Sequence, residues 1–134
     1  MAKPTCSDIM KVNLRTICED DDVSLAIAEM SHDEIRHLIV VDHAGRLVGV
    51  VSDRDLLDAR DRKIGEVMSR DVQAVGPATP ASYAVERMLC DKHSALPVVD
   101  HHGRPIGIVT STDFLDIAYR ALVGLDPHVQ RARA

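Results

Sequence analysis

Residues 38–55 read LIVVDHAGRLVGVVSDRD, and residues 96–113, which lie 58 positions further along the chain, read LPVVDHHGRPIGIVTSTD. The similarity extends outward from this stretch, because residues 10–59 align without a gap with residues 68–117. Positions that are identical in the two copies include Met10/Met68, Ala26/Ala84, Met30/Met88, Asp33/Asp91, Leu38/Leu96, Val40/Val98, Val41/Val99, Asp42/Asp100, Gly45/Gly103, Arg46/Arg104, Gly49/Gly107, Val51/Val109, Asp55/Asp113 and Leu57/Leu115. The chain therefore contains an internal repeat, and this repeat decides the fold.

A repeat of 58 residues is shorter than the roughly 70–80 residues at which one hydrophobic core is sufficient without disulfides or a metal. We therefore expect the two copies to share a core and to face each other about a pseudo-twofold axis. Such an arrangement creates two related clefts along the seam between the copies, and we expect the function to lie there.

Each copy is predicted to have the order βαββα, which gives an α/β fold class with two repeats packed through their sheets. Apolar residues at helical spacing predict one buried helix face in residues 23–30 and again in residues 81–88. Short apolar runs predict buried strands, and aspartate-to-glycine turns join them to the returning strands. The predicted strands are 14–17, 38–41 and 47–51 in the first copy and 72–75, 96–99 and 105–109 in the second, with last helices near 56–59 and 114–122.

The starts of the first long helices differ between the copies. Asp21 and Asp22 suit the positive end of a helix dipole, whereas Thr79 is predicted to be an N-cap with Pro80 at the first helical position. Both helix-start sequences are expected to begin the equivalent helix of their own copy.

The 134 residues are enough for one compact domain, and 46% of them are hydrophobic, which can supply a core. We expect an N-terminal arm and the first repeat in residues 1–60, and the second repeat, its last helix and a short arginine-containing tail in residues 61–134. Three cysteines, Cys6, Cys18 and Cys90, have no paired spacing, so we expect free thiols, with Cys90 as a small core residue.

Composition argues against several classes of partner. The chain has only three aromatic residues of the Phe, Trp and Tyr types, and its formal net charge of −5 comes without a basic stripe. We therefore expect no nucleic acid partner. No apolar run reaches the roughly 18 residues of a membrane span, and residues 1–5 lack the apolar core of a signal peptide. The expected location is cytoplasmic, without membrane contact.

A Gly-x-x-Ser/Thr-x-x-Asp sequence follows the second hairpin strand in both copies, where a strand becomes a helix. It pairs Ser52 with Asp55 and Thr110 with Asp113. The first interpretation is a capping box, in which the hydroxyl and the carboxylate satisfy backbone donors at the helix start. The second is a ligand site, in which the helix start attracts a phosphate and the aspartate accepts ribose hydroxyls. The spacing alone leaves both interpretations open.

The repeat, the LPVVD strand of residues 96–100 and the two Ser/Thr-x-x-Asp turns together resemble a pair of cystathionine β-synthase (CBS) domains, a Bateman module. The resemblance covers nearly the whole chain. It implies that adenosine-containing ligands such as AMP, ADP or ATP bind in the two clefts. It also implies a sensor that signals to a regulated protein, whose identity the sequence does not give, and a homodimer.

The resemblance also implies a set of site residues. Asp55 and Asp113 would hold ribose, Ser52 and Thr110 would approach phosphate, and the adenine would be held by the partner repeat. Residues 72–75 and 94–96 would thus lie opposite Asp55, and residues 14–17 and 37–39 opposite Asp113. The implied ligand-binding residues are Ser52, Arg54, Asp55, Thr110, Asp113, Arg36, His37, Ile17, Val75, Ser94 and Ala95.

The two copies differ at the phosphate side of this implied site. Arg36 and His37 precede the second strand of the first copy, where the second copy has Ser94 and Ala95. Cationic phosphate contacts occupy this place in the γ subunit of AMP-activated protein kinase. Arg36 and Arg54 are either such contacts or solvated side chains paired with carboxylates. A further difference from the family is Ile39, whose bulk could narrow a pocket where proline is common.

An adenine nucleotide is therefore the expected regulatory ligand, with no obligatory cofactor. The alternative is a structural or dimerisation module whose clefts bind no nucleotide. We expect no metal site, because His43, His101 and His102 belong to hairpin turns of different copies. No nucleophile has an evident base beside it, although His37 and Ser52 form a conceivable pair, so we do not expect an enzyme.

Overall fold

The structure is a computed structural model, which describes residues 3–124. Its elements are α1 (Cys6–Ile9), β1 (Thr16–Cys18), α2 (Val23–Asp33), β2 (His37–Val41), β3 (Leu47–Ser52), the single 3-10 turn η1 (Arg54–Leu56), α3 (Ile64–Val67), α4 (Ala81–Asp91), β4 (Ala95–Val99), β5 (Pro105–Thr110) and α5 (Ser111–Leu122). The predicted order of strands and long helices is thereby confirmed, except that the predicted strand 72–75 and the predicted helix near 56–59 do not form as such. The arginine-containing tail lies outside the described residues.

The two repeats have the same sheet topology. In the first, β1 pairs in parallel with β2, and β2 pairs antiparallel with β3. In the second, β4 pairs antiparallel with β5, and Val75 makes a parallel bridge to Val98 at the place that corresponds to β1. The first strand of the second repeat is thus reduced to one bridge, and the rest of the pairing repeats with the same register.

Both hairpin turns form as their sequences predict. The Asp42 side chain accepts hydrogen bonds from the backbone N–H groups of Ala44 and Arg46, both at 2.9 Å. Asp100 binds the corresponding two N–H groups at 2.8 and 3.1 Å. Gly45 and Gly103 follow with φ of 81° and 80°, a left-handed conformation that glycine adopts without steric cost.

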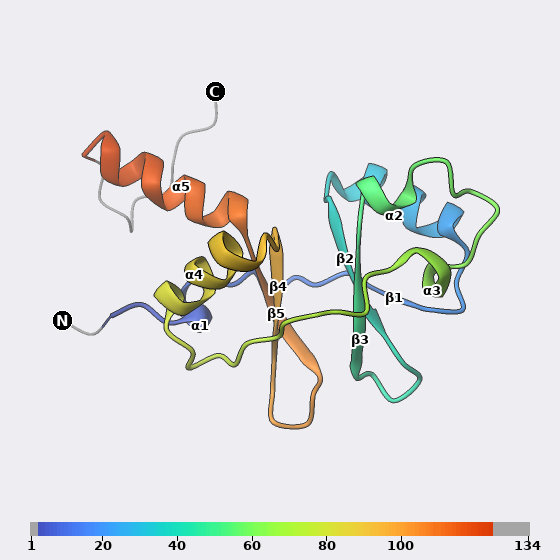
Figure 1. Ribbon diagram of the computed structural model, residues 1–134, viewed down its shortest axis with the longest axis horizontal. Coiled ribbons are helices and arrows are strands. Elements are labelled where there is room, and N and C mark those ends of the chain that lie inside the picture. Colours follow the sequence, from blue (N-terminus) through green and yellow to red (C-terminus); the bar gives the residue numbers. More distant parts are fainter. Residues whose placement is uncertain (1–2, 125–134) are drawn as a thin grey trace.

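The molecule has two lobes whose sheets face each other in the middle of the view, with the long helices on the outside (Figure 1). The first lobe contains β1, β2, β3, α2 and α3, and the second contains β4, β5, α1, α4 and α5. The hairpins also touch, because the backbone N–H of Leu47 donates to the carbonyl of Gly103 at 3.0 Å. The two repeats therefore pack through their sheets, as predicted.

The hydrophobic interior is divided between the lobes, so the expectation of one shared core was wrong. The first cluster is centred on Leu38, Val40 and Val51, and the second on Leu96, Val98 and Val109. Both leucines are fully buried beneath the outer helices. Each repeat contributes its own helix and hairpin to one cluster, because the helix covers the sheet of its own repeat.

The segments that open the repeats are nevertheless exchanged. Cys6 lies in the cluster of the second repeat, whereas Ile64 and Met68 lie in the cluster of the first. Figure 1 shows the chain leaving α1 beside α4, crossing to β1, and crossing back after α3. Each core is therefore completed by residues that precede the other repeat in the sequence, which is how a unit of this size obtains enough apolar surface.

Backbone hydrogen bonds fix both crossings. Lys11 and Ile108 exchange two N–H···O=C bonds of 2.9 and 3.0 Å, and Ser69 and Val50 exchange two of 2.9 and 3.1 Å. These bonds add the opening segments to the free edges of β5 and β3. As a result, Lys11 lies beside the end of a strand of the second repeat.

The end of the first repeat departs from the prediction. A helix was expected near residues 56–59, but only the 3-10 turn η1 forms, and Asp58 follows with a left-handed φ of 58°. A left-handed residue interrupts helical hydrogen bonding, so the chain turns away towards α3. In the second repeat the corresponding region forms the 12-residue helix α5. The secondary structure of the two repeats thus differs most at their C-terminal ends.

The predicted helix starts were partly wrong. The N-cap of α4 is Pro80 rather than Thr79. The Thr79 hydroxyl accepts a hydrogen bond from the Gly76 N–H at 3.0 Å, so it stabilises the turn before the helix. Asp22 is the N-cap of α2 without a capping side-chain bond, and it forms an ion pair with Lys63. The cysteines are free as expected, but Cys6 is the buried one and Cys90 is exposed.

Gly49 marks the closest approach between β3 and the incoming segment. A Cβ at this position would lie 2.8 Å from the backbone oxygen of Ser69, which is held in a hydrogen bond to Val50, and 2.8 Å from Met68 Sδ. We expect Gly49→Ala to lower the free energy of unfolding by about 2 kcal/mol through overpacking. Urea unfolding measures this change. Gly76→Ala is the control, because its Cβ would meet its nearest atom at 3.6 Å, and an equal loss in both variants would contradict the explanation.

Candidate functional site

The two Ser/Thr-x-x-Asp sequences form capping boxes. Thr110 N donates to Asp113 Oδ2 at 2.8 Å, and Asp113 N donates to Thr110 Oγ1 at 3.4 Å. Ser52 and Asp55 make the same two bonds at 2.8 and 3.3 Å. The capping interpretation is therefore correct, and it uses one oxygen of each carboxylate. Asp113 Oδ1 lies 3.3 Å from the ammonium group of Lys11.

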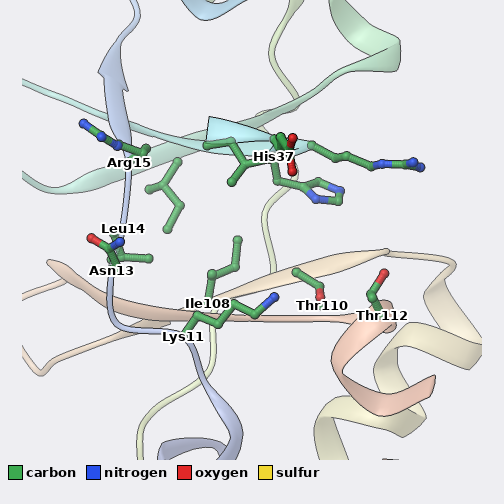
Figure 2. A pocket seen from close by; sticks show the side chains of 12 residues that line it. Lys11, Asn13, Leu14, Arg15, His37, Ile108, Thr110 and Thr112 are labelled. Atoms are coloured by element: carbon green, nitrogen blue, oxygen red, sulfur yellow. The ribbon is translucent and has the colours of Figure 1, made fainter. Parts of the chain in front are cut away.

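The capping box of Thr110 and Asp113 lies at the edge of a cleft between the lobes, which we call the Thr110 cleft (Figure 2). Its volume is about 250 Å³. Figure 2 shows Lys11, Thr110 and Thr112 on one side and His37 on the other. The lining residues are Lys11, Asn13, Leu14, Arg15, Glu34, Ile35, Arg36, His37, Ile39, Ile108, Thr110 and Thr112. The cleft thus combines the capping box of the second repeat with the strand β2 of the first.

A second cleft lies at the other capping box, and we call it the Ser52 cleft. Its volume is about 260 Å³. The lining residues are His37, Val50, Ser52, Asp55, Ser69, Asp71, Val72, Gln73, Lys92, His93, Ser94 and Ala95. Here the capping box belongs to the first repeat and the opposite wall to the second. The sequence prediction that Ser94 and Ala95 lie opposite Asp55 agrees with this lining.

The two clefts are copies of one another. Shifting the lining of the Thr110 cleft by 58 positions reproduces most of the Ser52 cleft, with the pairs Lys11/Ser69, Asn13/Asp71, Leu14/Val72, Arg15/Gln73, Glu34/Lys92, Ile35/His93, Arg36/Ser94, His37/Ala95, Ile108/Val50 and Thr110/Ser52. This correspondence is what a pseudo-twofold relation between the repeats requires. The backbone is repeated closely, whereas the charged side chains are not.

The three cationic side chains of the Thr110 cleft differ in their ion pairing with carboxylates. Arg15 Nε lies 2.8 Å from Asp33 Oδ2. The pKa of Asp33 is lowered by a hydrogen bond from His32 and then by the charge of Arg15. Lys11 contacts Asp113, as described above. Arg36 is exposed and forms no ion pair within residues 3–124.

His37 belongs to both clefts. It begins β2, faces Ser52 across the hairpin, and places its Nε2 3.1 Å from Ser94 Oγ of the other repeat. The conceivable His37–Ser52 pair is therefore adjacent in register, but the hydrogen bond goes to Ser94. Burial lowers the pKa of His37 below its usual 6.5, and the charges of Asp53 and Asp55 oppose this effect. The side chain of His37 therefore lines both clefts, and its lowered pKa favours the neutral ring.

This burial predicts a pH dependence of stability. Because the folded state holds His37 at a lowered pKa, the unfolded chain binds a proton more readily. The contribution of the neutral ring is therefore fully present above the unfolded value of 6.5 and is lost as the pH falls through the folded value. We expect His37→Asn to weaken the fall in unfolding free energy below pH 6.5, as measured by urea unfolding at several pH values. His43→Asn, at an exposed turn, is the control, and equal pH profiles for the wild type and His37→Asn would contradict this assignment.

Three predicted site residues lie outside the clefts. Ile17 and Val75 are buried in the two cores, because the side chains at these strand positions point towards the helices. Arg54 lies on η1 and is not among the residues that line the Ser52 cleft. The other predicted residues line a cleft or, in the case of Asp113, adjoin one through Lys11.

Sequence reasoning missed several lining residues. Lys11, Asn13 and Asp71 lie on the crossing segments, and Glu34 and Lys92 end the long helices in left-handed conformations, with φ of 55° and 59°. The repeat itself contained a usable signal, because these positions form pairs at the 58-residue offset with different charges. The sequence did not indicate that the opening segments cross between the lobes, and this crossing brings Lys11, Asn13 and Asp71 to the clefts.

The fold defines a protein of two tandem α/β repeats, whose two clefts are related by a pseudo-twofold axis. The CBS domain model matches residues 6–62 and again residues 64–120. The chain therefore belongs to the CBS domain family and contains two CBS domains in tandem.

Two relatives differ greatly in length. A homoserine O-acetyltransferase of Methanococcoides burtonii is 37% identical over 110 residues, which are 80% of this chain but 22% of that protein. A CBS domain-containing protein of Dictyostelium discoideum is 29% identical over 142 residues, covering 93% of this chain and 98% of that protein. The chain thus spans about a fifth of the first relative and nearly all of the second.

Solved structures share the fold. The CBS domain pair of protein MJ0100, in complex with 5′-methylthioadenosine and S-adenosyl-L-methionine, has a TM-score of 0.81 at 28% identity and covers 92% of this chain and 98% of that chain. CBSX2 in complex with AMP has a TM-score of 0.78 at 29% identity, covering 88% and 98%. The cytosolic domain of the Mg²⁺ channel MgtE in complex with ATP has a TM-score of 0.76 at 32% identity, covering 84% and 48%.

Residues 3–124 lack two features, a membrane-spanning helix and a metal-binding group of side chains. None of the helices there combines the length and the apolar character needed to cross a membrane. Within the same residues, no three His, Cys, Asp or Glu side chains are grouped so that they could hold a metal ion.

Proposed function

We propose that this protein is a regulatory sensor module that binds an adenosine-containing ligand in the clefts between its CBS repeats and signals occupancy to a partner protein. The observation that carries the proposal is the repetition of one cleft design, in which the hydroxyl of a capping box in one repeat, that of Thr110 or Ser52, faces the start of the second strand of the other repeat. The related structures with AMP, ATP and 5′-methylthioadenosine support it.

The chemistry of the clefts suits a nucleoside. The capping box uses only one oxygen of each aspartate. The second oxygen of Asp55 can accept a ribose hydroxyl, and Asp113 Oδ1, which lies 3.3 Å from the ammonium group of Lys11, can accept one beside this contact or in its place. Ile39 and Ile108 in one cleft, and Val50 and Ala95 in the other, offer apolar surface to a base. Volumes of about 250 and 260 Å³ lie near the lower limit of about 300 Å³ for small-molecule pockets. A mononucleoside therefore fits this size class better than a dinucleotide.

Signalling requires that the ligand prefer one arrangement of the lobes. Each cleft has walls from both lobes, so a ligand that contacts both walls shifts the equilibrium between arrangements by its difference in affinity for them. His37 lines both clefts and contacts Ser94 of the opposite repeat. The regulated partner protein is proposed to bind one arrangement of the two lobes more tightly than the other.

We also propose that two copies of this chain form a homodimer through their outer helices. The outer helices expose large apolar side chains, among them Leu89 at 76%, Leu115 at 69% and Leu122 at 85%. Large apolar side chains that are exposed on neighbouring helices favour burial against another chain. The second candidate function, a structural module, rests on this surface and on the fact that both capping boxes are already satisfied without a ligand.

Isothermal titration separates these two functions. The wild-type protein is titrated with AMP, ADP, ATP, NADH and S-adenosylmethionine, and the same titrations are repeated with Asp55→Asn and Asp113→Asn. The sensor proposal expects saturable binding that one of these substitutions weakens. A stable dimer in sedimentation experiments that binds none of the five ligands would instead favour the structural module.

A further inference from the structure

The two clefts have the same backbone but opposite charge. The Thr110 cleft is lined by three cations, Lys11, Arg15 and Arg36, and by one carboxylate, that of Glu34. The Ser52 cleft is lined by two carboxylates, those of Asp55 and Asp71, and by one cation, Lys92. Asp55 is not part of this contrast, because its counterpart Asp113 adjoins the Thr110 cleft through Lys11. Since the other lining positions correspond through the repeat, the remaining contrast comes from the side chains and not from the shape of the cleft.

Four of the paired positions make the Thr110 cleft more positive. The pairs are Lys11/Ser69, Asn13/Asp71, Arg15/Gln73 and Arg36/Ser94. One pair, Glu34/Lys92, acts in the opposite direction. His93 also lines the Ser52 cleft and adds positive charge only when it is protonated. The balance therefore favours an anion in the Thr110 cleft.

Ion pairing leaves part of this charge available. Arg15 is held by Asp33, and Lys11 is shared with Asp113. Arg36 has no ion-pair partner within residues 3–124 and remains exposed at the cleft wall. In the Ser52 cleft, Asp71 likewise lacks an ion pair among the described residues. A phosphate would thus meet an unpaired guanidinium in one cleft and an unpaired carboxylate in the other.

The segments that follow the two capping boxes also make the Thr110 cleft more favourable for an anion than the Ser52 cleft. Thr110 is the N-cap of α5, which has 12 residues, and Thr112 in its first turn lines the cleft. Ser52 precedes η1, which has three residues. A macrodipole of useful size requires several aligned turns, so the positive field of a helix start reaches only the Thr110 cleft.

We propose that the Thr110 cleft binds a phosphate-bearing adenosine nucleotide, whereas the Ser52 cleft binds an adenosyl compound whose 5′ substituent carries no negative charge. This inference rests on the proposed function, and it assigns a different class of ligand to each cleft. One chain then senses two ligands at once, and His37, which lines both clefts, separates them.

AMP and 5′-methylthioadenosine test the proposal, because they share the adenosine group and differ at the 5′ position. Isothermal titration of the wild-type protein is expected to give one equivalent of each ligand, and saturation with one is expected to leave the binding of the other in place. Two equal equivalents of AMP, or displacement of AMP by 5′-methylthioadenosine, would overturn the inference while the sensor function stands.

The repeat supplies matched variants, since each copy can be given the residue of the other. Arg36→Ser is expected to lower the affinity for AMP about tenfold, because it removes a charged contact to phosphate, while the affinity for 5′-methylthioadenosine stays the same. Asp71→Asn is expected to give a measurable second equivalent of AMP. Arg104→Ser removes the same charge at an exposed position after the hairpin turn, away from the residues that line the clefts, and is the control.

The outcomes separate the two proposals. Equal losses of both ligands in Arg36→Ser, or equal losses of AMP in Arg36→Ser and Arg104→Ser, would overturn the division of ligands between the clefts. If neither ligand binds the wild-type protein, the inference is overturned, and the proposed function fails as well only if ADP, ATP, NADH and S-adenosylmethionine also do not bind.

Discussion

Replacement of Leu96 by alanine is expected to lower the free energy of unfolding by about 3 kcal/mol. The side chain is fully buried in the cluster of the second repeat, between Val98, Val109 and the helix residue Ala84. Truncation removes its transfer free energy and leaves a cavity that the surrounding strands and helix fill only in part, and such changes cost about 2–5 kcal/mol. Urea unfolding followed by circular dichroism measures the difference.

Leu115→Ala is the matched control, because Leu115 in α5 is 69% exposed and its truncation leaves no cavity. A loss of equal size in this variant would contradict the assignment of the core. The exchange of opening segments adds an expectation about cooperativity. Since Cys6 completes one core and Ile64 the other, both lobes are expected to unfold in a single transition, and separate transitions in Leu96→Ala would contradict the tight coupling.

Asp113→Asn is expected to lower the affinity for AMP about tenfold to a hundredfold, which corresponds to roughly 1.5–3 kcal/mol for hydrogen bonds to a charged group. The asparagine retains one oxygen for the backbone N–H of Thr110, so the start of α5 is preserved. It loses the second acceptor oxygen, which the sensor proposal assigns to the ribose. Isothermal titration measures the affinity, and thermal unfolding checks that the fold is retained.

The chain contains a close control for this variant. Thr5 and Asp8 form a third capping box, in which Thr5 N donates to Asp8 Oδ2 at 2.8 Å, the same distance as in the Thr110 box. Asp8 is exposed and lines neither cleft. Asp8→Asn therefore changes the same local interaction without touching a proposed ligand. If it lowers AMP affinity as much as Asp113→Asn, the effect of Asp113 is one of stability and not of binding.

Much of the fold could be predicted from the sequence because its signals are local. The aspartate-to-glycine turns form where the sequence placed them, since each aspartate bonds to backbone N–H groups two and four residues away. The capping boxes are equally local. The prediction failed where local signals conflict, as at residues 56–59, where apolar spacing suggested a helix but the left-handed Asp58 ends the turn.

The site was predicted only in part for a related reason. Ile17 and Val75 end the short segments LRTI (14–17) and VQAV (72–75), and segments of this length do not indicate which residues meet the core and which meet the cleft. Lys11 and Asp71 lie on crossing segments whose destination has no sequence signature. Hence the hydroxyl–carboxylate pairs and much of the opposite walls, including Leu14, His37, Val72 and Ser94, were predictable, whereas Lys11 and Asp71 on the crossing segments were not.

The sequence by itself determined the duplication, the order of the strands and long helices, the turns and the hydroxyl–carboxylate pairs, because periodicity and short-range hydrogen bonds act within a few residues. Only the tertiary structure decided that the opening segments cross between the lobes, that Lys11 reaches Asp113, and that His37 contacts Ser94 57 residues away. These contacts depend on how two sheets pack and on which core has room for each segment. The sequence supplies the differing charges of the two copies, and the packing gathers them into two clefts.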